Sequence, residues 1–375
     1  MMVSLLDRPV ACEEGRSLHP DICRRVERYR QFYASNRPGD LLIVIRPRWV
    51  KKKNLFEYDF ENGGHLAMAA DMLSSSQAML AEGGDRDDDL IPWLCPDLGI
   101  AIHHTFLVDV PVTFAEWTSW AEHPLAGEDG YARLPELRFD PANRWVRRNR
   151  EMLEFWQAHN DGSCLMNTHM HFGPLDLANA LRGNALFTDF YDYPDEVTAL
   201  LDLCTEAIIA LEAHLRGVCS KQIEEVGMPF WGALAPPGSL YVSEDAMDLS
   251  GPALSEQWGL PWTTRIRERF GGLAVHHHMM GRAVHGVVGR LARHSIAQIS
   301  NDPNCPPAIS CLGELFEASG SNALMLDASA DEILSHLDEL KKGRAILICP
   351  CADPGKAAEV VAAVRSVSNI GGKER

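Results

Sequence analysis

From about residue 160 to the C-terminus, short apolar segments alternate with amphipathic helical patterns, and a similar apolar segment occurs near residue 41. The segments that we interpret as strands are mostly apolar throughout, which is typical of strands buried on both faces. They are Leu41–Ile45, Cys164–Thr168, Pro229–Leu234, Leu273–His276, Ser295–Ser300, Ala323–Leu326 and Ala345–Cys349. Regular alternation of this kind predicts a parallel sheet covered by helices.

The helices between these strands carry their own sequence signals. Apolar residues after Pro194 recur at alternating steps of four and three, which places them on one stripe of a helix. This stripe consists of Val197, Leu201, Cys204, Ile208, Leu211 and Leu215. Ser329 and Glu332 have the spacing of a capping box, and Asp353-Pro354 is typical of a helix start.

A closed barrel and an open doubly wound sheet both fit this alternation. An open sheet that binds nucleotides would carry a glycine motif, but neither GxGxxG nor GxxxxGK[ST] follows the first strand. We therefore predict an α/β fold, a single TIM (β/α)8 barrel over residues 36–370, with an N-terminal extension at residues 1–35 and no nucleotide cofactor. Residues 50–150 are expected to form helical excursions and long loops over the barrel mouth.

The charge balance restricts the partners of this 375-residue chain. It has 35 Lys and Arg against 52 Asp and Glu, a formal net charge of −17. So acidic a surface repels nucleic acid and anionic membranes, which leaves a small-molecule substrate as the expected partner. No apolar run approaches the roughly 18 residues of a membrane helix. Ten cysteines without an export signal predict reduced thiols and a cytoplasmic location.

In barrels of this type the reaction takes place where strands end, at the C-terminal face. Polar side chains collect at five predicted strand ends or in the loops that follow them. Three are candidate catalytic groups: His171, Glu244 and Asp245. Three are candidate substrate contacts: His169, Asn301 and Asp302. Three are candidate metal ligands: His276, His278 and Cys351.

The His276-His277-His278 triplet is the densest of these features. Alternate side chains of a strand share a face, so His276 and His278 point the same way. Two imidazoles together with a thiolate from another strand could hold zinc. The alternative is a set of hydrogen-bonded histidines at a strand mouth.

Two further clusters lie closer to the N-terminus. Arg46 and Arg48 begin a basic cluster after the first strand, which either binds an anionic substrate or forms a solvated loop. Asp89 closes the run Asp87-Asp88-Asp89, which could supply a general acid, a metal ligand or only a polar turn.

Several segments of the chain resemble the uroporphyrinogen decarboxylase superfamily in their order and spacing. They are Asp161-Gly162-Ser163, residues 173–183 (GPLDLANALRG), residues 192–197 (DYPDEV), Ser243-Glu244-Asp245, Leu249-Ser250, residues 259–262 (GLPW) and residues 275–281 (VHHHMMG). The resemblance covers about residues 150–365 and implies a TIM barrel.

Within that superfamily, the resemblance implies two chemistries. The decarboxylases use no cofactor and hold substrate carboxylates with N-terminal arginines, here Arg46 and Arg48, beside an aspartate that loosely matches Asp89. The corrinoid-dependent methyltransferases bind zinc through a His-x-Cys and a cysteine at the last strand end, matched here by His278 and Cys351. Met280 replaces the middle cysteine, so His276 is expected to substitute as the third ligand.

The sequence thus favours a zinc-dependent enzyme that moves a methyl group between a corrinoid, carried by a partner corrinoid protein, and a thiol or other small acceptor. Two alternatives remain open at this point. One is a cofactor-independent decarboxylase of a carboxylated tetrapyrrole, and the other is a non-catalytic subunit that binds a corrinoid or tetrapyrrole.

Overall fold

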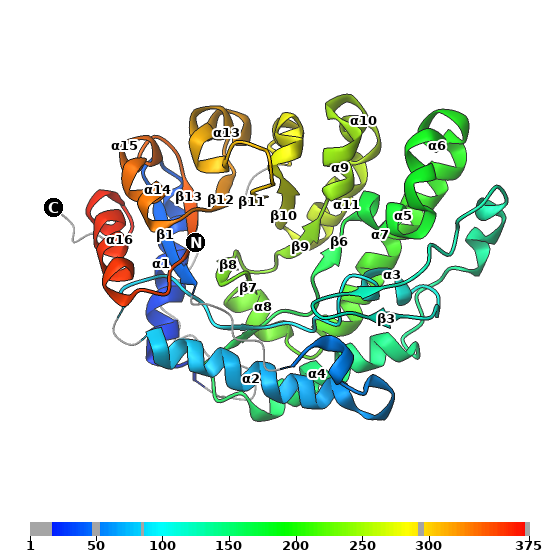
Figure 1. The fold of residues 1–375 in the computed structure, drawn as a ribbon, viewed down its shortest axis with the longest axis horizontal. Coiled ribbons are helices and arrows are strands. Elements are labelled where there is room, and N and C mark those ends of the chain that lie inside the picture. The colour runs from blue at the N-terminus through cyan, green and yellow to red at the C-terminus, as the bar shows by residue number, and fades with distance from the viewer. Residues whose placement is uncertain (1–16, 47–52, 84–85, 292–295, 372–375) are drawn as a thin grey trace, which may run out of the picture.

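A computed structural model describes residues 17–46, 53–83, 86–291 and 296–371 of the chain. The protein is an α/β structure built on a parallel seven-stranded sheet (Figure 1). Its strand order is β1-β13-β12-β11-β10-β9-β6, and every neighbouring pair is parallel. The strands are β1 (Leu41–Arg46), β6 (His171–Phe172), β9 (Leu240–Ser243), β10 (Leu273–His278), β11 (Ile296–Ser300), β12 (Ala323–Asp327) and β13 (Ala345–Pro350).

Three two-stranded pairs complete the strands of the described chain. β2 (Trp93–Leu94) runs parallel to β5 (Leu165–Met166). The other pairs are antiparallel: β3 (Thr113–Phe114) with β4 (Ser119–Trp120), and β7 (Met228–Phe230) with β8 (Ala233–Ala235). The segment before β2 contacts β1, because the backbone N–H of Asp89 donates to the carbonyl of Ile43 at 2.7 Å.

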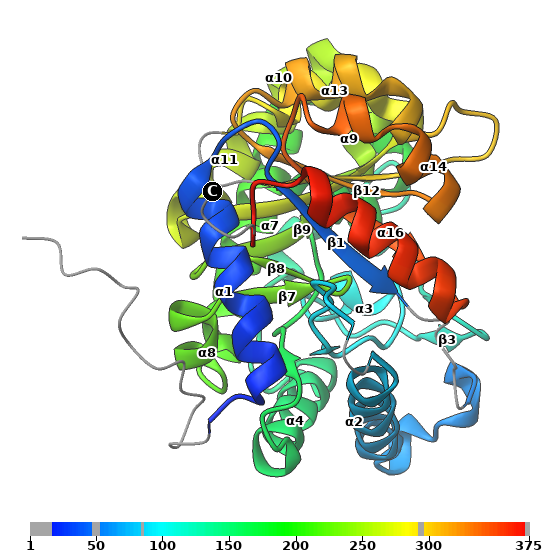
Figure 2. The same cartoon turned by 90° about the vertical axis from the view of Figure 1, so that its left-hand side faces the viewer.

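Helices follow most strands of the sheet along the chain. The α-helices are α1 (Pro20–Ser35), α2 (Gly64–Gly83), α3 (Ile102–Thr105), α4 (Arg144–His159), α5 (Pro174–Arg182), α6 (Leu186–Asp192), α7 (Pro194–Arg216), α8 (Ser220–Glu225), α9 (Asp245–Ser250), α10 (Pro252–Trp258), α11 (Leu260–Phe270), α12 (His285–Val288), α13 (Leu312–Ser319), α14 (Ala330–Ser335), α15 (Leu337–Leu340) and α16 (Pro354–Val367). Helices α1 and α16 pack against β1 (Figure 2), so the two ends of the described chain meet at the same strand.

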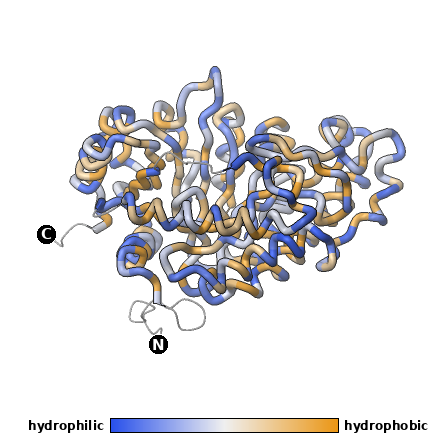
Figure 3. Tube along the Cα trace, turned by 60° about the horizontal axis from the view of Figure 1, so that its bottom comes forward, coloured by the Kyte–Doolittle hydropathy of each residue, from blue (hydrophilic) through white to orange (hydrophobic). Residues whose placement is uncertain are grey.

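The helix predictions that rested on apolar periodicity or on capping residues are confirmed. The stripe predicted for α7 is buried along its whole length, from Val197 to Leu215. Ser329 caps α14 by accepting from the N–H of Glu332, whose carboxylate accepts in return from the N–H of Ser329. Asp353 likewise caps α16. Hydrophobic and hydrophilic stretches alternate along the helical trace (Figure 3), as expected of helices with one buried face.

The strand predictions match four of the sheet strands closely, namely β1, β10, β12 and β13. For β11, the predicted strand agrees with the structure over Ile296–Ser300, which is the part of it that the structure describes. The prediction of one strand at Pro229–Leu234 is wrong. That segment is the hairpin of β7 and β8, which turns at Trp231 and Gly232, where the backbone φ angles are +50° and +86°. Strand β9 was not predicted, because four residues after Pro236-Pro237-Gly238 give too short an apolar pattern.

Two buried apolar clusters cover the two faces of the sheet near β1. Leu42 and Val44 belong to one cluster, while Leu41, Ile43 and Ile45 belong to the other. Paired residues on neighbouring strands point to the same face of the sheet. The residues paired in this way with Leu42, from β1 across to β10, are Ile346, Met325, Gln298 and His276. The side chain of His276 therefore lies on the same face of the sheet as that of Leu42. Within the described residues, no helix is both long and apolar enough to cross a membrane.

Candidate metal centre

Two histidines of β10 and one aspartate at the start of α9 converge at the end of the sheet. The Nε2 atoms of His276 and His278 lie 3.2 Å apart. The carboxylate of Asp245 lies 3.5 Å from Nε2 of His276 and 3.7 Å from Nε2 of His278. In the part of the chain that the structure describes, this is the one group of three His, Cys, Asp or Glu side chains with ligand atoms within 4.8 Å of each other.

The other ring nitrogen of each histidine is held by an oxygen acceptor. Nδ1 of His278 donates to Oδ1 of Asp302 at 2.7 Å. Nδ1 of His276 donates to Oε1 of Gln298, whose amide nitrogen is turned to Ser300 Oγ at 3.2 Å. In neutral imidazoles this arrangement keeps the proton on Nδ1, so that both Nε2 atoms would present lone pairs to the same point. Metal-binding histidines in proteins are oriented in this way.

Asp245 reaches the histidines because β9 pairs with β10. Ser243 lies opposite His276 in this pairing, and Asp245 follows it as the first residue of α9. The turn is fixed by Asp176, whose carboxylate accepts from the backbone N–H of Ala246 at 2.6 Å and from Ser243 Oγ at 2.8 Å. The Asp245 side chain is 47% exposed and so remains open to a ligand.

The chemistry of this donor set fits a divalent transition metal. Two neutral imidazoles and one carboxylate hold zinc in several hydrolases and Fe(II) in oxygenases, with positions left for substrate. Burial lowers the pKa of His276, an effect that the nearby charge of Asp245 only partly offsets. The ring is therefore neutral at pH 7, as a metal ligand must be.

Two aromatic rings and one ion pair lie beside the group of Asp245, His276 and His278, which we call the centre. The rings of Trp231 and Tyr241 lie 6.3 Å and 6.4 Å from the ring of His276. Arg46, at the end of β1, pairs with Asp327 at the end of β12, with 3.1 Å between Nη2 and Oδ1. Burial raises the pKa of Asp327, although the charge of Arg46 opposes this.

Glu244 lies beside the centre but is fully buried. Its Oε1 accepts from Thr263 Oγ1 at 2.5 Å, and the backbone N–H groups of Leu175 and Asp176 at the start of α5 also contribute hydrogen bonds to the carboxylate. Burial raises the pKa of Glu244 to about 8. This candidate catalytic group is therefore held as a neutral acid below that pH.

The structure places His169 and His171 in a different cluster, at the start of β6 and in the loop before it. His171 Nε2 contacts Glu212 Oε2 at 3.0 Å, and His169 Nε2 contacts His103 Nδ1 at 3.0 Å. Burial lowers the pKa of His103 to about 3. Both predicted residues are thus occupied by contacts outside the Asp245, His276 and His278 group.

Cys351 is not a member of the metal-ligand group, in contrast to the expectation from the sequence. Its Sγ lies 3.4 Å from the carbonyl of Asp353, and its side chain packs against the apolar cluster of Leu41 and Ile43. Asn301 fixes the backbone instead, donating to the carbonyl of Asp327 and accepting from Ala308. Arg48 lies outside the described residues.

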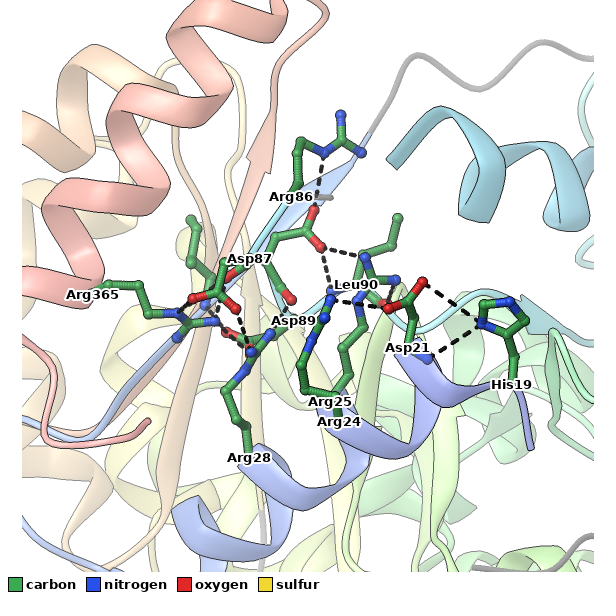
Figure 4. A network of polar contacts seen from close by, with 12 residues as sticks. His19, Asp21, Arg24, Arg25, Arg28, Arg86, Asp87, Asp89, Leu90 and Arg365 are labelled. Atoms are coloured by element: carbon green, nitrogen blue, oxygen red, sulfur yellow. Dashed lines mark hydrogen bonds and ion pairs between the residues drawn. The ribbon is translucent and has the colours of Figure 1, made fainter. Parts of the chain in front are cut away.

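Asp89 is buried in an ion-pair network (Figure 4). Its Oδ1 accepts from Arg28 at 2.5 Å and lies 2.8 Å from Arg365 Nη2, and its Oδ2 accepts from the backbone N–H of Ile43 at 2.7 Å. These contacts join α1, β1 and α16, so Asp89 has a structural place in the fold, with both carboxylate oxygens engaged.

Three residues of the centre were not predicted from the sequence. Gln298 is a polar residue in an otherwise apolar strand, which is a signal that could have indicated it. Trp231 depends on a hairpin that was not foreseen. Asp248, which accepts from the backbone N–H of His278 at 2.6 Å, lies within α9 and carries no distinguishing pattern.

No protein-family model and no curated protein matches the sequence. Among solved structures, the chain is similar to a methyltransferase from Methanosarcina mazei, with a TM-score of 0.59 and 11% sequence identity. The match covers 91% of this chain and 98% of that one. The similarity shows that the two proteins share a fold over nearly their whole lengths.

Proposed function

We propose that this chain is a zinc-dependent methyltransferase that moves a methyl group between a corrinoid and a thiol or other small acceptor. Three findings support the proposal: the sequence resemblance, the fold shared with a methyltransferase, and a group of side chains with metal-binding geometry. The observation that carries it is the pair of Nε2 atoms of His276 and His278, which face each other at 3.2 Å with Asp245 beside them.

The roles of the residues follow from their contacts. His276, His278 and Asp245 would hold the metal, while Gln298 and Asp302 keep the two imidazoles in the required orientation. Zinc bound there would lower the pKa of an acceptor thiol, so that a thiolate forms near neutral pH. The methyl donor would arrive on a corrinoid protein, the partner that the resemblance implies.

We also infer that the sheet closes into a (β/α)8 barrel. The backbone bond from Asp89 to Ile43 joins the segment before β2 to β1, and β2 pairs with β5. The chain then runs from β5 to β6, which pairs with β9. These contacts lead from one edge of the seven-stranded sheet to the other, as in the barrel that the superfamily resemblance implies.

The described contacts favour methyl transfer over decarboxylation of a tetrapyrrole. That reaction would require Asp89 and Arg46 to face the substrate. Asp89 is instead fully engaged by Arg28, Arg365 and Ile43, and Arg46 is paired with Asp327.

The metal content of the purified, untagged protein tests the proposal most directly. We expect about one zinc per chain in the wild type and in Cys351→Ser, whose thiol lies outside the ligand group, and little in His276→Ala and His278→Ala. With methylcobalamin and ethanethiol as substrates, loss of the methylcobalamin absorbance should require the same two histidines. Wild-type protein that binds no metal when zinc is supplied would refute the proposal, as would methyl transfer that survives loss of both histidines.

A further inference from the structure

Trp231 occupies an unfavourable backbone conformation at the edge of the metal centre. Its φ of +50° lies in the left-handed region, which bulky side chains rarely adopt. The other two non-glycine residues with positive φ in the described chain are Asn36 and Asn304, a residue type that tolerates this conformation. Strain at a single bulky residue points to a function for its side chain.

The hairpin that carries Trp231 is built into the protein interior. Phe230 pairs with Ala233, so the turn consists of Trp231 and Gly232 alone. Asn-Gly is the usual choice for such a two-residue turn. The carbonyl of Gly232 accepts from the N–H of Ile91 at 2.8 Å, and a Cβ on Gly232 would lie only 3.2 Å from Val44. The turn is therefore fixed against β1 and the segment before β2.

The indole is directed toward the ligand group. Its plane is inclined by 23° to the ring of His276, with 6.3 Å between the ring centres. Its Nε1 donates to the hydroxyl of Tyr241 at 3.4 Å, which fixes the rotation of the ring. Trp231 is half-buried, whereas Tyr241 is buried, so the indole is the aromatic surface that a ligand beside His276 would meet.

The charges around the centre restrict the ligand further. Arg46 is already neutralised by Asp327. A divalent metal would balance Asp245 and Asp302, and Asp248 together with a bound thiolate would then leave negative charge in excess. A positive group on the acceptor restores neutrality, and the face of an indole is the best aromatic surface for a cation.

We propose that Trp231 is a specificity residue that selects an acceptor thiol bearing an ammonium group, with the thiolate on the metal and the cation against the indole. This inference rests on the proposed function and names the substrate class of that same centre. It predicts that a cationic thiol binds more tightly than a neutral thiol, and a neutral thiol more tightly than an anionic one.

The test uses full-length protein loaded with cobalt(II), whose visible absorption reports thiolate binding. The three probes are 2-aminoethanethiol, 2-mercaptoethanol and 3-mercaptopropionate. The wild type should bind the aminothiol about three- to thirtyfold more tightly than mercaptoethanol. Trp231→Leu should abolish this preference and leave the cobalt content unchanged, while Trp231→Phe should retain part of it. Trp262→Leu is the control, because that indole bonds to Asp202 on α7.

The outcomes separate this proposal from the proposed function. Equal affinities for the three thiols in the wild type would overturn it, even if Trp231→Leu failed to fold. So would tightest binding of the anionic thiol, or a preference that Trp231→Leu retains. A wild-type protein that takes up no cobalt would refute the metal centre itself, and both proposals would then fail together.

Discussion

The Nε2 atoms of His276 and His278 face each other 3.2 Å apart. Nδ1 of His276 donates to Gln298, and Nδ1 of His278 donates to Asp302. Two lone pairs at this distance repel unless a cation lies between them or near both. A metal bound at the proposed centre would use both lone pairs, and the groups that hold the two Nδ1 atoms would then matter as much as the ligands.

The first prediction concerns Asp302, which holds His278 without being a ligand. Asp302→Asn should weaken zinc binding by about 10- to 100-fold, because the imidazole loses its fixed orientation and part of its basicity. Zinc affinity can be measured by competition with a chromogenic chelator. Asp338→Asn is the matched control, since Asp338 is 93% exposed and pairs with Lys341 on the surface. Equal zinc affinity in both variants would contradict the role assigned to Asp302.

The second prediction tests whether the aspartates before β2, Asp87 and Asp89, stabilise the fold or belong to the metal centre. Asp89→Asn should lower the free energy of unfolding by about 3–5 kcal/mol, because Arg28 and Arg365 lose a buried partner. Asp87→Asn should cost less than about 1 kcal/mol, since the Asp87 side chain is 59% exposed. Urea denaturation of both variants measures the difference. Zinc content should be unchanged in each, and a loss of zinc in Asp89→Asn alone would place this residue in the centre after all.

The sequence predicted the strands of the sheet where they were long and apolar throughout, as in β1, β10, β12 and β13. It failed at β9, whose four residues follow a proline-rich turn. Asp245 comes beside His276 only because β9 pairs with β10. Asp245 was predicted as a catalytic group, whereas the family resemblance implied a metal ligand at the last strand end, in Cys351, whose side chain packs on the other apolar cluster.

His276 and His278 could be grouped from the sequence because alternate residues of one strand share a face. Contacts between distant segments could not be derived in this way. Asp302 and Gln298 reach the imidazoles through the register of β10 and β11, and Trp231 arrives on a hairpin that antiparallel pairing creates. These relationships depend on pairing partners, which the pattern of a single segment does not specify.

The third prediction tests the fixed position of the hairpin turn. Gly232→Ala should destabilise the protein by about 1–3 kcal/mol, because φ is +86° and the added methyl would lie 3.0 Å from Leu90 Cδ1. Gly286→Ala makes the same chemical change in α12, where nothing lies within 4 Å of the new Cβ, and should be neutral or slightly stabilising. Thermal denaturation compares the two. A Gly232→Ala protein as stable as the wild type would show that the turn is free to move.

The fourth prediction concerns the buried carboxylate of Glu212 on α7. Burial alone would raise its pKa, but the hydrogen bond from His171, the charge of Arg216 and the hydrogen bond from Thr168 together lower the pKa to about 2. A carboxylate with a pKa lower in the folded than in the unfolded protein stabilises the fold above the unfolded pKa of about 4.3. This contribution, roughly 3 kcal/mol, is lost as the pH falls from about 4.5 to 2.

Glu212→Gln should therefore be less stable than the wild type by about 3 kcal/mol at pH 7, and the difference should shrink below about pH 4.5. Urea denaturation at a series of pH values measures both effects. Glu206→Gln on the same helix is the control, because Glu206 is 67% exposed and pairs with the surface residue Arg265. Its effect should stay below about 1 kcal/mol at every pH. If the deficit of Glu212→Gln persisted unchanged at about pH 3, its cause would be altered packing, because a lost charge interaction must follow the titration of the carboxylate.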